Sequence, residues 1–287
     1  MMKIKCNITL LSFFLLLLLY ATSLIVAQEL EHESEFGYQD NSTKAPKFWG
    51  KLNKEWEACK AEGDHRQSPI DICDEKVITS LMYVNLIKDY KPADAQLKNR
   101  GHDIAVYWQG NPGSVKIDGI VYDLQQCHWH SPSEHAINGK RYDMELHMLH
   151  KDKNDKVAVI AQLYKIGRPD TFLSKLCKEI ISLGHNHENK TVGKMDPKDI
   201  EIAGHNYYRY IGSLTVPPCT EGVTWIVNQE IATVSHDQVK LLRDTVHDNA
   251  EENARPVQPH NSREIVLYTL DPNYKEPAPS TLRGRTG

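Results

Sequence analysis

The sequence lacks three features that would widen the range of functions: an excess of basic residues, internal repeats, and linker-like stretches. Lysine and arginine number 34 against 38 aspartates and glutamates, which gives a formal net charge of −4. This balance, without a basic stripe, argues against nucleic acid as a partner. The absence of repeats and linkers predicts one domain, which we expect to span 38–270 between polar tails at 28–37 and 271–287.

A single long apolar run stands near the N-terminus. The segment Ile8 to Val26 is almost wholly apolar and follows a short basic start. This pattern predicts a signal peptide at 1–27, cleaved after Ala27. About 18 apolar residues could also anchor the chain in a membrane, but Ser12 and Thr22 interrupt the run and no positive stop-transfer flank follows it. We therefore expect a secreted protein with no stable membrane span after cleavage.

The cysteines and the glycosylation sequons fit an extracellular protein. Cys6 lies in the predicted signal peptide, so cleavage leaves five of the six cysteines. Five is an odd number, and at least one thiol therefore stays free. The secretory pathway permits a disulfide and also glycosylation, for which Asn41 and Asn189 head the two acceptor sequons.

Apolar residues alternate along much of the chain, which predicts a mainly β fold. The segments with this alternation are 104–108, 115–122, 125–131, 144–150, 157–166, 223–227 and 265–270. Helical spacing is convincing only at 170–183, which stops before Gly184, and at 235–246, which opens with Ser235 and Gln238 in capping-box spacing.

Two of the predicted strands carry residues suited to metal binding. His128 and His130 are two residues apart, so a strand would point both to one face, together with Gln126. His147 and Glu145 share a face of another predicted strand. If the two strands are neighbours, three imidazoles converge, a set that suits zinc and leaves a fourth position for water. Gln126 and Glu145 could then hydrogen-bond the far nitrogens of the imidazoles.

Three blocks of sequence resemble the signature blocks of the alpha carbonic anhydrases, in family order and spacing. They are Gln126-Cys-His-Trp-His-Ser-Pro-Ser-Glu-His135, Glu145-Leu-His-Met-Leu-His150 and Gly212-Ser-Leu-Thr-Val-Pro-Pro-Cys219. Shorter matches stand at 67–72, 99–102, 223–225 and 253–256, and the resemblance covers about 38–270. The first block is most similar to secreted plant members of the nectarin and dioscorin type.

This resemblance implies a large twisted, mostly antiparallel sheet with a few peripheral helices, and reversible hydration of carbon dioxide to bicarbonate. It implies that His128, His130 and His147 bind Zn²⁺. Thr215 would accept a hydrogen bond from zinc-bound hydroxide and donate its own proton to Glu134, which orients the nucleophile.

The resemblance also assigns roles outside the ligand set. His102 matches the proton shuttle of the family, for which an imidazole pKa near 6.5 is suitable. Cys59 and Cys219 match the disulfide of secreted members. Val216 replaces a threonine common in the family, which removes one hydrogen bond to bicarbonate. The residues that match the apolar substrate pocket are Val159, Leu214, Val216, Val223 and Trp225.

Three other functions compete with this interpretation. A cupin would share a His-x-His motif followed by Glu134, but the Pro-x-Gly stretch expected before its last histidine is absent. A Ser-His-Asp hydrolase is not supported, because Ser235, His236 and Asp237 are consecutive residues and the sequence contains no nucleophile elbow. The remaining alternative is a secreted storage or nectar protein of the same scaffold with little or secondary activity, against which the complete ligand set argues.

Overall fold

The computed structural model describes residues 35–60, 63–80, 86–184, 189–202, 204–246 and 252–269. The predicted signal peptide and the C-terminal tail therefore lie outside the described residues. Phe36, which we assigned to the polar N-terminal tail, is only 2% exposed and belongs to a packed cluster. The folded domain thus begins before Tyr38. None of the described helices is long and apolar enough to cross a membrane.

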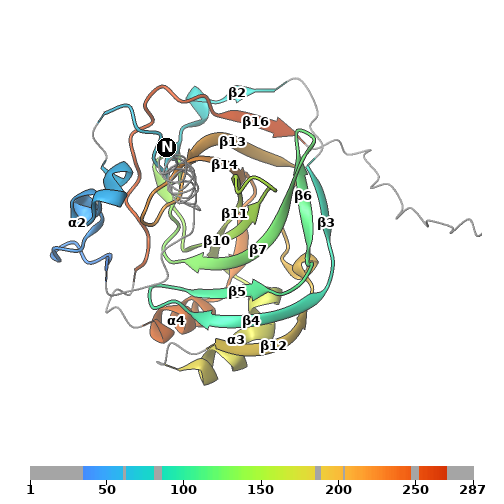
Figure 1. Ribbon diagram of the computed structural model, residues 1–287. Helices are drawn as coiled ribbons and strands as arrows, with labels where there is room; N and C mark the ends of the chain where they lie inside the picture. Colours follow the sequence, from blue (N-terminus) through green and yellow to red (C-terminus); the bar gives the residue numbers. More distant parts are fainter. Residues whose placement is uncertain are drawn as a thin grey trace, which may run out of the picture.

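A sheet of thirteen strands dominates the molecule (Figure 1), and the predicted mainly β class is confirmed. Ten strands follow one another in the order β12-β4-β5-β7-β10-β11-β14-β13-β16-β2, while β3, β6 and β15 pair beside this path. The bounds are β2 (Ile78–Thr79), β3 (Ile87–Tyr90), β4 (Ala93–Asn99), β5 (Ile104–Trp108), β6 (Gly113–Ile117), β7 (Ile120–His130), β10 (Met144–Lys151), β11 (Val157–Ile166), β12 (Asn189–Met195), β13 (Asn206–Ser213), β14 (Glu221–Asn228), β15 (Ala232–Val234) and β16 (Val266–Thr269).

Most neighbours in this sheet are antiparallel, as expected from the resemblance. The parallel exceptions are β14 and β15, which both pair with β11, and β2, which pairs with β16. A second, small sheet contains β1 (Asp71–Ile72), β8 (Ala136–Ile137) and β9 (Lys140–Arg141). Short 3-10 turns lie at Pro46–Phe48, Lys54–Cys59, Asp74–Lys76 and Pro197–Asp199, and a short helix α2 at Trp49–Leu52.

The two faces of the central strands serve different purposes. Because strand side chains alternate, Cys127 and Met148 point to one face, where they join the large core under α3 (Thr171–Leu183) and α4 (His236–Thr245). Cys127 is fully buried there, as small core filling. Figure 1 draws both helices at the lower end of the molecule, near β4 and β12. His128 and its neighbours lie on the opposite face of the sheet.

Both predicted helices are present, within one or two residues of their expected ends. Asp170 caps α3 by accepting a hydrogen bond from the Leu173 N–H at 2.7 Å. Ser235 and Gln238 form the expected capping box of α4. The single strand predicted at 115–122 is wrong, because Asp118 and Gly119 both have positive φ and turn the chain between β6 and β7. An Asp-Gly pair favours this kind of tight hairpin turn.

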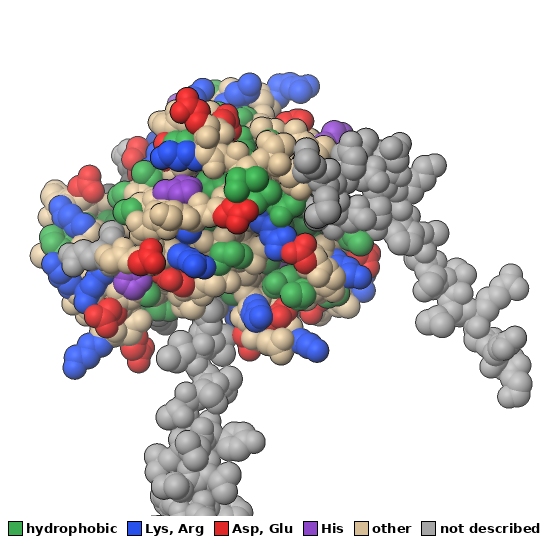
Figure 2. Space-filling model, turned by 90° about the horizontal axis from the view of Figure 1, so that it is seen from above, with side chains coloured by type: hydrophobic (Ala, Val, Ile, Leu, Met, Phe, Trp, Pro, Cys, Tyr) green, Lys and Arg blue, Asp and Glu red, His purple; other side chains and the backbone are tan. Residues whose placement is uncertain are grey.

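The N-terminal segment is fixed to the rest of the domain by a disulfide and an aromatic cluster. Cys59 and Cys219 form the expected disulfide, 160 residues apart, and Cys73, Cys127 and Cys177 are free. Around the disulfide pack Phe36, Tyr38, Trp49, Trp56 and Val216. On the surface drawn in Figure 2, basic and acidic side chains are interspersed rather than gathered in one patch.

Candidate metal centre

Three imidazoles meet on the face of the sheet opposite the helices. β7 and β10 are antiparallel neighbours, and their register places His147 directly opposite His128 and Glu145 opposite His130. One nitrogen from each of His128, His130 and His147 lies within 4.8 Å of the others. The ring centroids are 4.6 to 5.2 Å apart. The alternation of two strands in register is therefore sufficient to bring the three side chains together.

Each imidazole is oriented by a hydrogen bond through its other nitrogen. Nδ1 of His128 donates to Oε1 of Gln126 at 2.9 Å, and Nε2 of His147 donates to Oε1 of Glu145 at 2.8 Å. Nδ1 of His130 donates to the backbone carbonyl of Asn253 at 2.8 Å. The nitrogens left for coordination are thus Nε2 of His128, Nε2 of His130 and Nδ1 of His147. Such partners fix the tautomer of a ligating histidine.

The lowered pKa values of His128 and His147 favour the binding of a cation. Burial lowers the pKa of His128 well below its usual value, and the positive charge of Arg100 lowers it further. Burial also lowers the pKa of His147. Neutral imidazoles are the form that binds metal. Nε2 of His130 is buried and has no hydrogen-bond partner among the described residues, a cost that a metal ion would remove. The donor set therefore fits zinc.

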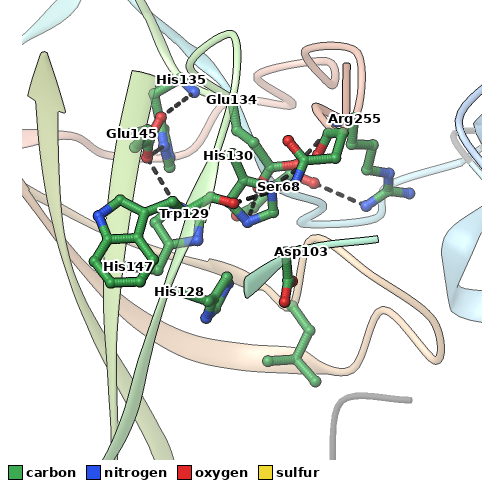
Figure 3. A network of polar contacts seen from close by, with 12 residues as sticks. Ser68, Asp103, His128, Trp129, His130, Glu134, His135, Glu145, His147 and Arg255 are labelled. Atoms are coloured by element: carbon green, nitrogen blue, oxygen red, sulfur yellow. Dashed lines mark hydrogen bonds and ion pairs between the residues drawn. The ribbon is translucent and has the colours of Figure 1, made fainter. Parts of the chain in front are cut away.

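Glu145 extends the site into a chain of buried hydrogen bonds (Figure 3). Its carboxylate also accepts hydrogen bonds from the backbone N–H of His135 at 2.8 Å and from Nδ1 of His135 at 2.7 Å. Although burial alone would raise it, these partners and His147 hold the pKa of Glu145 well below its usual value. Nε2 of His135 in turn lies 2.7 Å from the Tyr210 hydroxyl, which lies 2.8 Å from Ser68 Oγ. These contacts orient Glu145, and through it His147.

Glu134 and Thr215 both lie in loops, and Glu134 approaches the cluster. Oε1 of Glu134 accepts a hydrogen bond from the backbone N–H of Arg255 at 2.9 Å, and Oε2 lies 3.6 Å from Nε2 of His130. Oε2 has no hydrogen-bond partner among the described residues. Thr215 is buried in the loop between β13 and β14. Its expected hydrogen bond to Glu134 stays a prediction.

Arg255 was not foreseen as part of this arrangement. Its buried guanidinium donates to Gln67 Oε1 and to the Ser68 carbonyl, both at 2.8 Å, and to the Cys59 carbonyl at 3.0 Å. Burial lowers the pKa of Arg255 to about 10. The backbone N–H of Arg255 binds Glu134 and its guanidinium binds the Cys59 carbonyl, so Arg255 links Glu134 to the disulfide-bonded segment. The sequence signal for this role was the match at 253–256, which also contains Asn253.

Four of the five residues expected in the apolar pocket lie together. Val159, Leu214, Val223 and Trp225 are buried in one cluster, and the ring centroid of Trp225 is 4.9 Å from that of His147. Val216 instead packs into the cluster around the disulfide. An apolar wall therefore borders the imidazoles on the side of β11 and β14.

The remaining expected residues are placed as follows. His102 is 4% exposed, and its ring centroid lies 4.2 Å from that of Phe36 and 5.5 Å from that of Tyr38. A shuttle in this position can exchange protons with solvent only through neighbouring groups or after a side-chain movement.

The two sequon residues, Asn41 and Asn189, are exposed on the surface.

Comparison with known proteins agrees with this geometry. Residues 44–269 match the family model of the eukaryotic-type carbonic anhydrases. The chain is 52% identical to alpha carbonic anhydrase 7 of Arabidopsis thaliana, over 84% of this chain and 87% of that protein. It is 49% identical to carbonic anhydrase Nec1 of Nesocodon mauritianus, over 90% and 94% of the two chains.

A solved structure gives the same result for the fold. The crystal structure of dioscorin complexed with ascorbate superposes with a TM-score of 0.79 at 41% identity, covering 83% of this chain and 99% of that one. Since the family model spans most of the chain and several relatives exceed 40% identity over more than four fifths of it, this protein belongs to the alpha carbonic anhydrase family.

Proposed function

We propose that the protein is a zinc enzyme that catalyses the reversible hydration of carbon dioxide to bicarbonate and a proton. The observation that carries this proposal is the convergence of three imidazoles, each with its second nitrogen already hydrogen-bonded. Three protein ligands are typical of catalytic zinc, whereas structural zinc sites use four.

The residues around the imidazoles support this chemistry. Zinc, when bound, supplies a Lewis acid that makes water a nucleophile near neutral pH. Thr215 orients the nucleophile by donating its proton to Glu134, whose other oxygen is held by the Arg255 N–H. The wall of Val159, Leu214, Val223 and Trp225 holds the apolar substrate and excludes water. His102 accepts the released proton and passes it toward solvent.

A storage or nectar protein with secondary activity remains the second candidate. It is favoured by a specific finding, the 42% identity to dioscorin DB3S of Dioscorea polystachya over 88% of this chain and 94% of that one. The complete set of His128, His130 and His147 favours the enzyme. The Cys59–Cys219 disulfide, together with the N-terminal apolar run, supports secretion, because disulfides persist in oxidising compartments.

Zinc content and carbon dioxide hydration, measured on the same secreted preparation, test this proposal. We expect one zinc per chain and hydration far above the uncatalysed rate. A chelator should abolish hydration, and added zinc should restore it. A chain that binds zinc but hydrates no carbon dioxide would favour the storage function instead.

A further inference from the structure

The face of the sheet that carries the imidazoles continues past His128 to β5 and β4. In the sheet register, His128 stands opposite Ala105, and Ala105 opposite Lys98. In the next row, Gln126 stands opposite Tyr107. Paired residues on neighbouring strands point to the same face. His128 and Gln126 are buried, whereas Tyr107 and Lys98 are half-buried, so this face becomes open to solvent toward β4.

Two cationic side chains flank Tyr107 on this open side. Nζ of Lys98 lies 5.8 Å from the centroid of the Tyr107 ring. Nη1 of Arg100, from the loop between β4 and β5, lies 3.5 Å from the Tyr107 hydroxyl oxygen. Tyr107 stands opposite Gln126, whose Oε1 accepts the hydrogen bond from Nδ1 of His128. Arg100 therefore lies along the same face of the sheet as the imidazoles.

Asp103 holds Arg100 in this position. Nε of Arg100 donates to Oδ1 of Asp103 at 2.7 Å, and Nη2 donates to Oδ2 at 2.6 Å. Both side chains are about 5% exposed. Asp103 also lines a small cavity together with Trp129, His130 and Asn253, among others. A bidentate pair fixes the guanidinium plane, and the carboxylate offsets part of the charge that it holds.

We propose that Lys98 and Arg100 form a cationic wall that selects small oxyanions such as bicarbonate at the metal site. Asp103 reduces the attraction that Arg100 exerts on these anions, because its carboxylate offsets part of the positive charge. The wall lies across the imidazoles from the apolar wall of β11 and β14, so the neutral and the anionic reactant each meet a suitable surface. The positive charges of Lys98 and Arg100 attract an anion at the metal site through their electric field, without direct contact. The inference deepens the proposed function and depends on it for the identity of the metal site.

Equilibrium binding of ligands to the cobalt-substituted protein tests the cationic wall without any turnover. Visible absorption would give dissociation constants for an anion, acetate, and for a neutral ligand, 1,2,4-triazole, at low ionic strength. The variants are Lys98→Gln, Arg100→Gln, Asp103→Asn and the double variant Arg100→Gln/Asp103→Asn. Lys240→Gln is the matched control, since this exposed lysine on α4 pairs with Asp244 and its loss changes the net charge equally.

We expect Lys98→Gln and Arg100→Gln each to weaken acetate binding about three- to fivefold, the effect of one charge roughly 10 Å away in a partly hydrated site. Asp103→Asn should strengthen acetate binding, and the double variant should return it close to the native value. Triazole binding should change less than about twofold throughout, and Lys240→Gln should change neither ligand.

Two results would overturn the inference. One is unchanged acetate binding in both Lys98→Gln and Asp103→Asn, which do not depend on Arg100→Gln folding. The other is an equal change for acetate and triazole, because it would show that the Arg100–Asp103 pair only closes the loop between β4 and β5. A chain that binds no cobalt would contradict the proposed metal centre, whereas cobalt binding with unaltered anion affinity would contradict the wall alone.

Discussion

Acid should destabilise the protein through His150, a buried histidine outside the metal centre. Nε2 of His150 lies 2.8 Å from the Tyr90 hydroxyl, and both side chains are buried. Burial lowers the pKa of His150 to about 4, whereas an unfolded chain binds the proton at about 6.5. Between these values the unfolded state holds more protons, so the free energy of unfolding falls as the pH falls.

The magnitude follows from the difference between the two pKa values. Each pKa unit corresponds to about 1.4 kcal/mol, so His150 should account for about 3 kcal/mol of the stability lost between pH 7 and pH 4. His150→Gln keeps a polar partner for Tyr90 but cannot take up the proton. Urea unfolding of the metal-free protein at several pH values, followed by tryptophan fluorescence, would measure the difference between variant and parent.

Tyr90→Phe is the matched control, because it removes the hydrogen bond and leaves the imidazole buried. It should lower the free energy of unfolding by about 1 kcal/mol and keep the acid dependence of the parent. If His150→Gln loses as much stability in acid as the parent does, the reasoning from burial is refuted.

Three further results are expected. Replacing Cys59 and Cys219 with serine should cost about 5 kcal/mol of unfolding free energy in the chain-entropy model, measured by denaturation; an unchanged midpoint would contradict it. His102→Ala should slow hydration in dilute buffer while zinc content is kept, and small imidazole buffers should restore part of the rate; a variant as fast as the parent would remove the shuttle role. Thr215→Ala should lower kcat by about a hundredfold through lost orientation of the nucleophile, measured by stopped-flow hydration with zinc content as control, and native kcat would contradict that role.

Alternation, combined with the pairing of two strands, was sufficient for the central geometry. It placed His128 and His130 on one face, and the register of β7 with β10 then aligned His147 with them. The partner of His130 could not be foreseen in this way, because it is the backbone carbonyl of Asn253, 123 residues further along the chain. A carbonyl acceptor leaves no trace in side-chain periodicity, and only the matched block at 253–256 pointed to this segment.

Two of the strands that we did not predict, β12 and β13, have different physical reasons. β12 carries lysines and small residues, since it is the outer strand of the path and most of its side chains are at least partly exposed. Such edge strands need little apolar alternation. β13 was missed although it is largely buried, because its tyrosines interrupt a simple apolar pattern with polar hydroxyls.

Conversely, the break between β6 and β7 had a local signal. Asp118 and Gly119 form a dipeptide suited to positive φ at both positions. The apolar residues on either side of this pair continue the alternation, so periodicity by itself predicts one strand across the turn. Turn chemistry should therefore be considered before alternation when a long strand is predicted.

The most direct test of the proposed metal centre is stopped-flow carbon dioxide hydration by His147→Gln, with zinc content measured on the same sample. This substitution puts an uncharged amide in place of one of three protein ligands and leaves the neighbouring residues on the apolar face unchanged. We expect near-native circular dichroism, little bound zinc and hydration close to the uncatalysed rate. Full hydration with one zinc per chain in this variant would contradict the account.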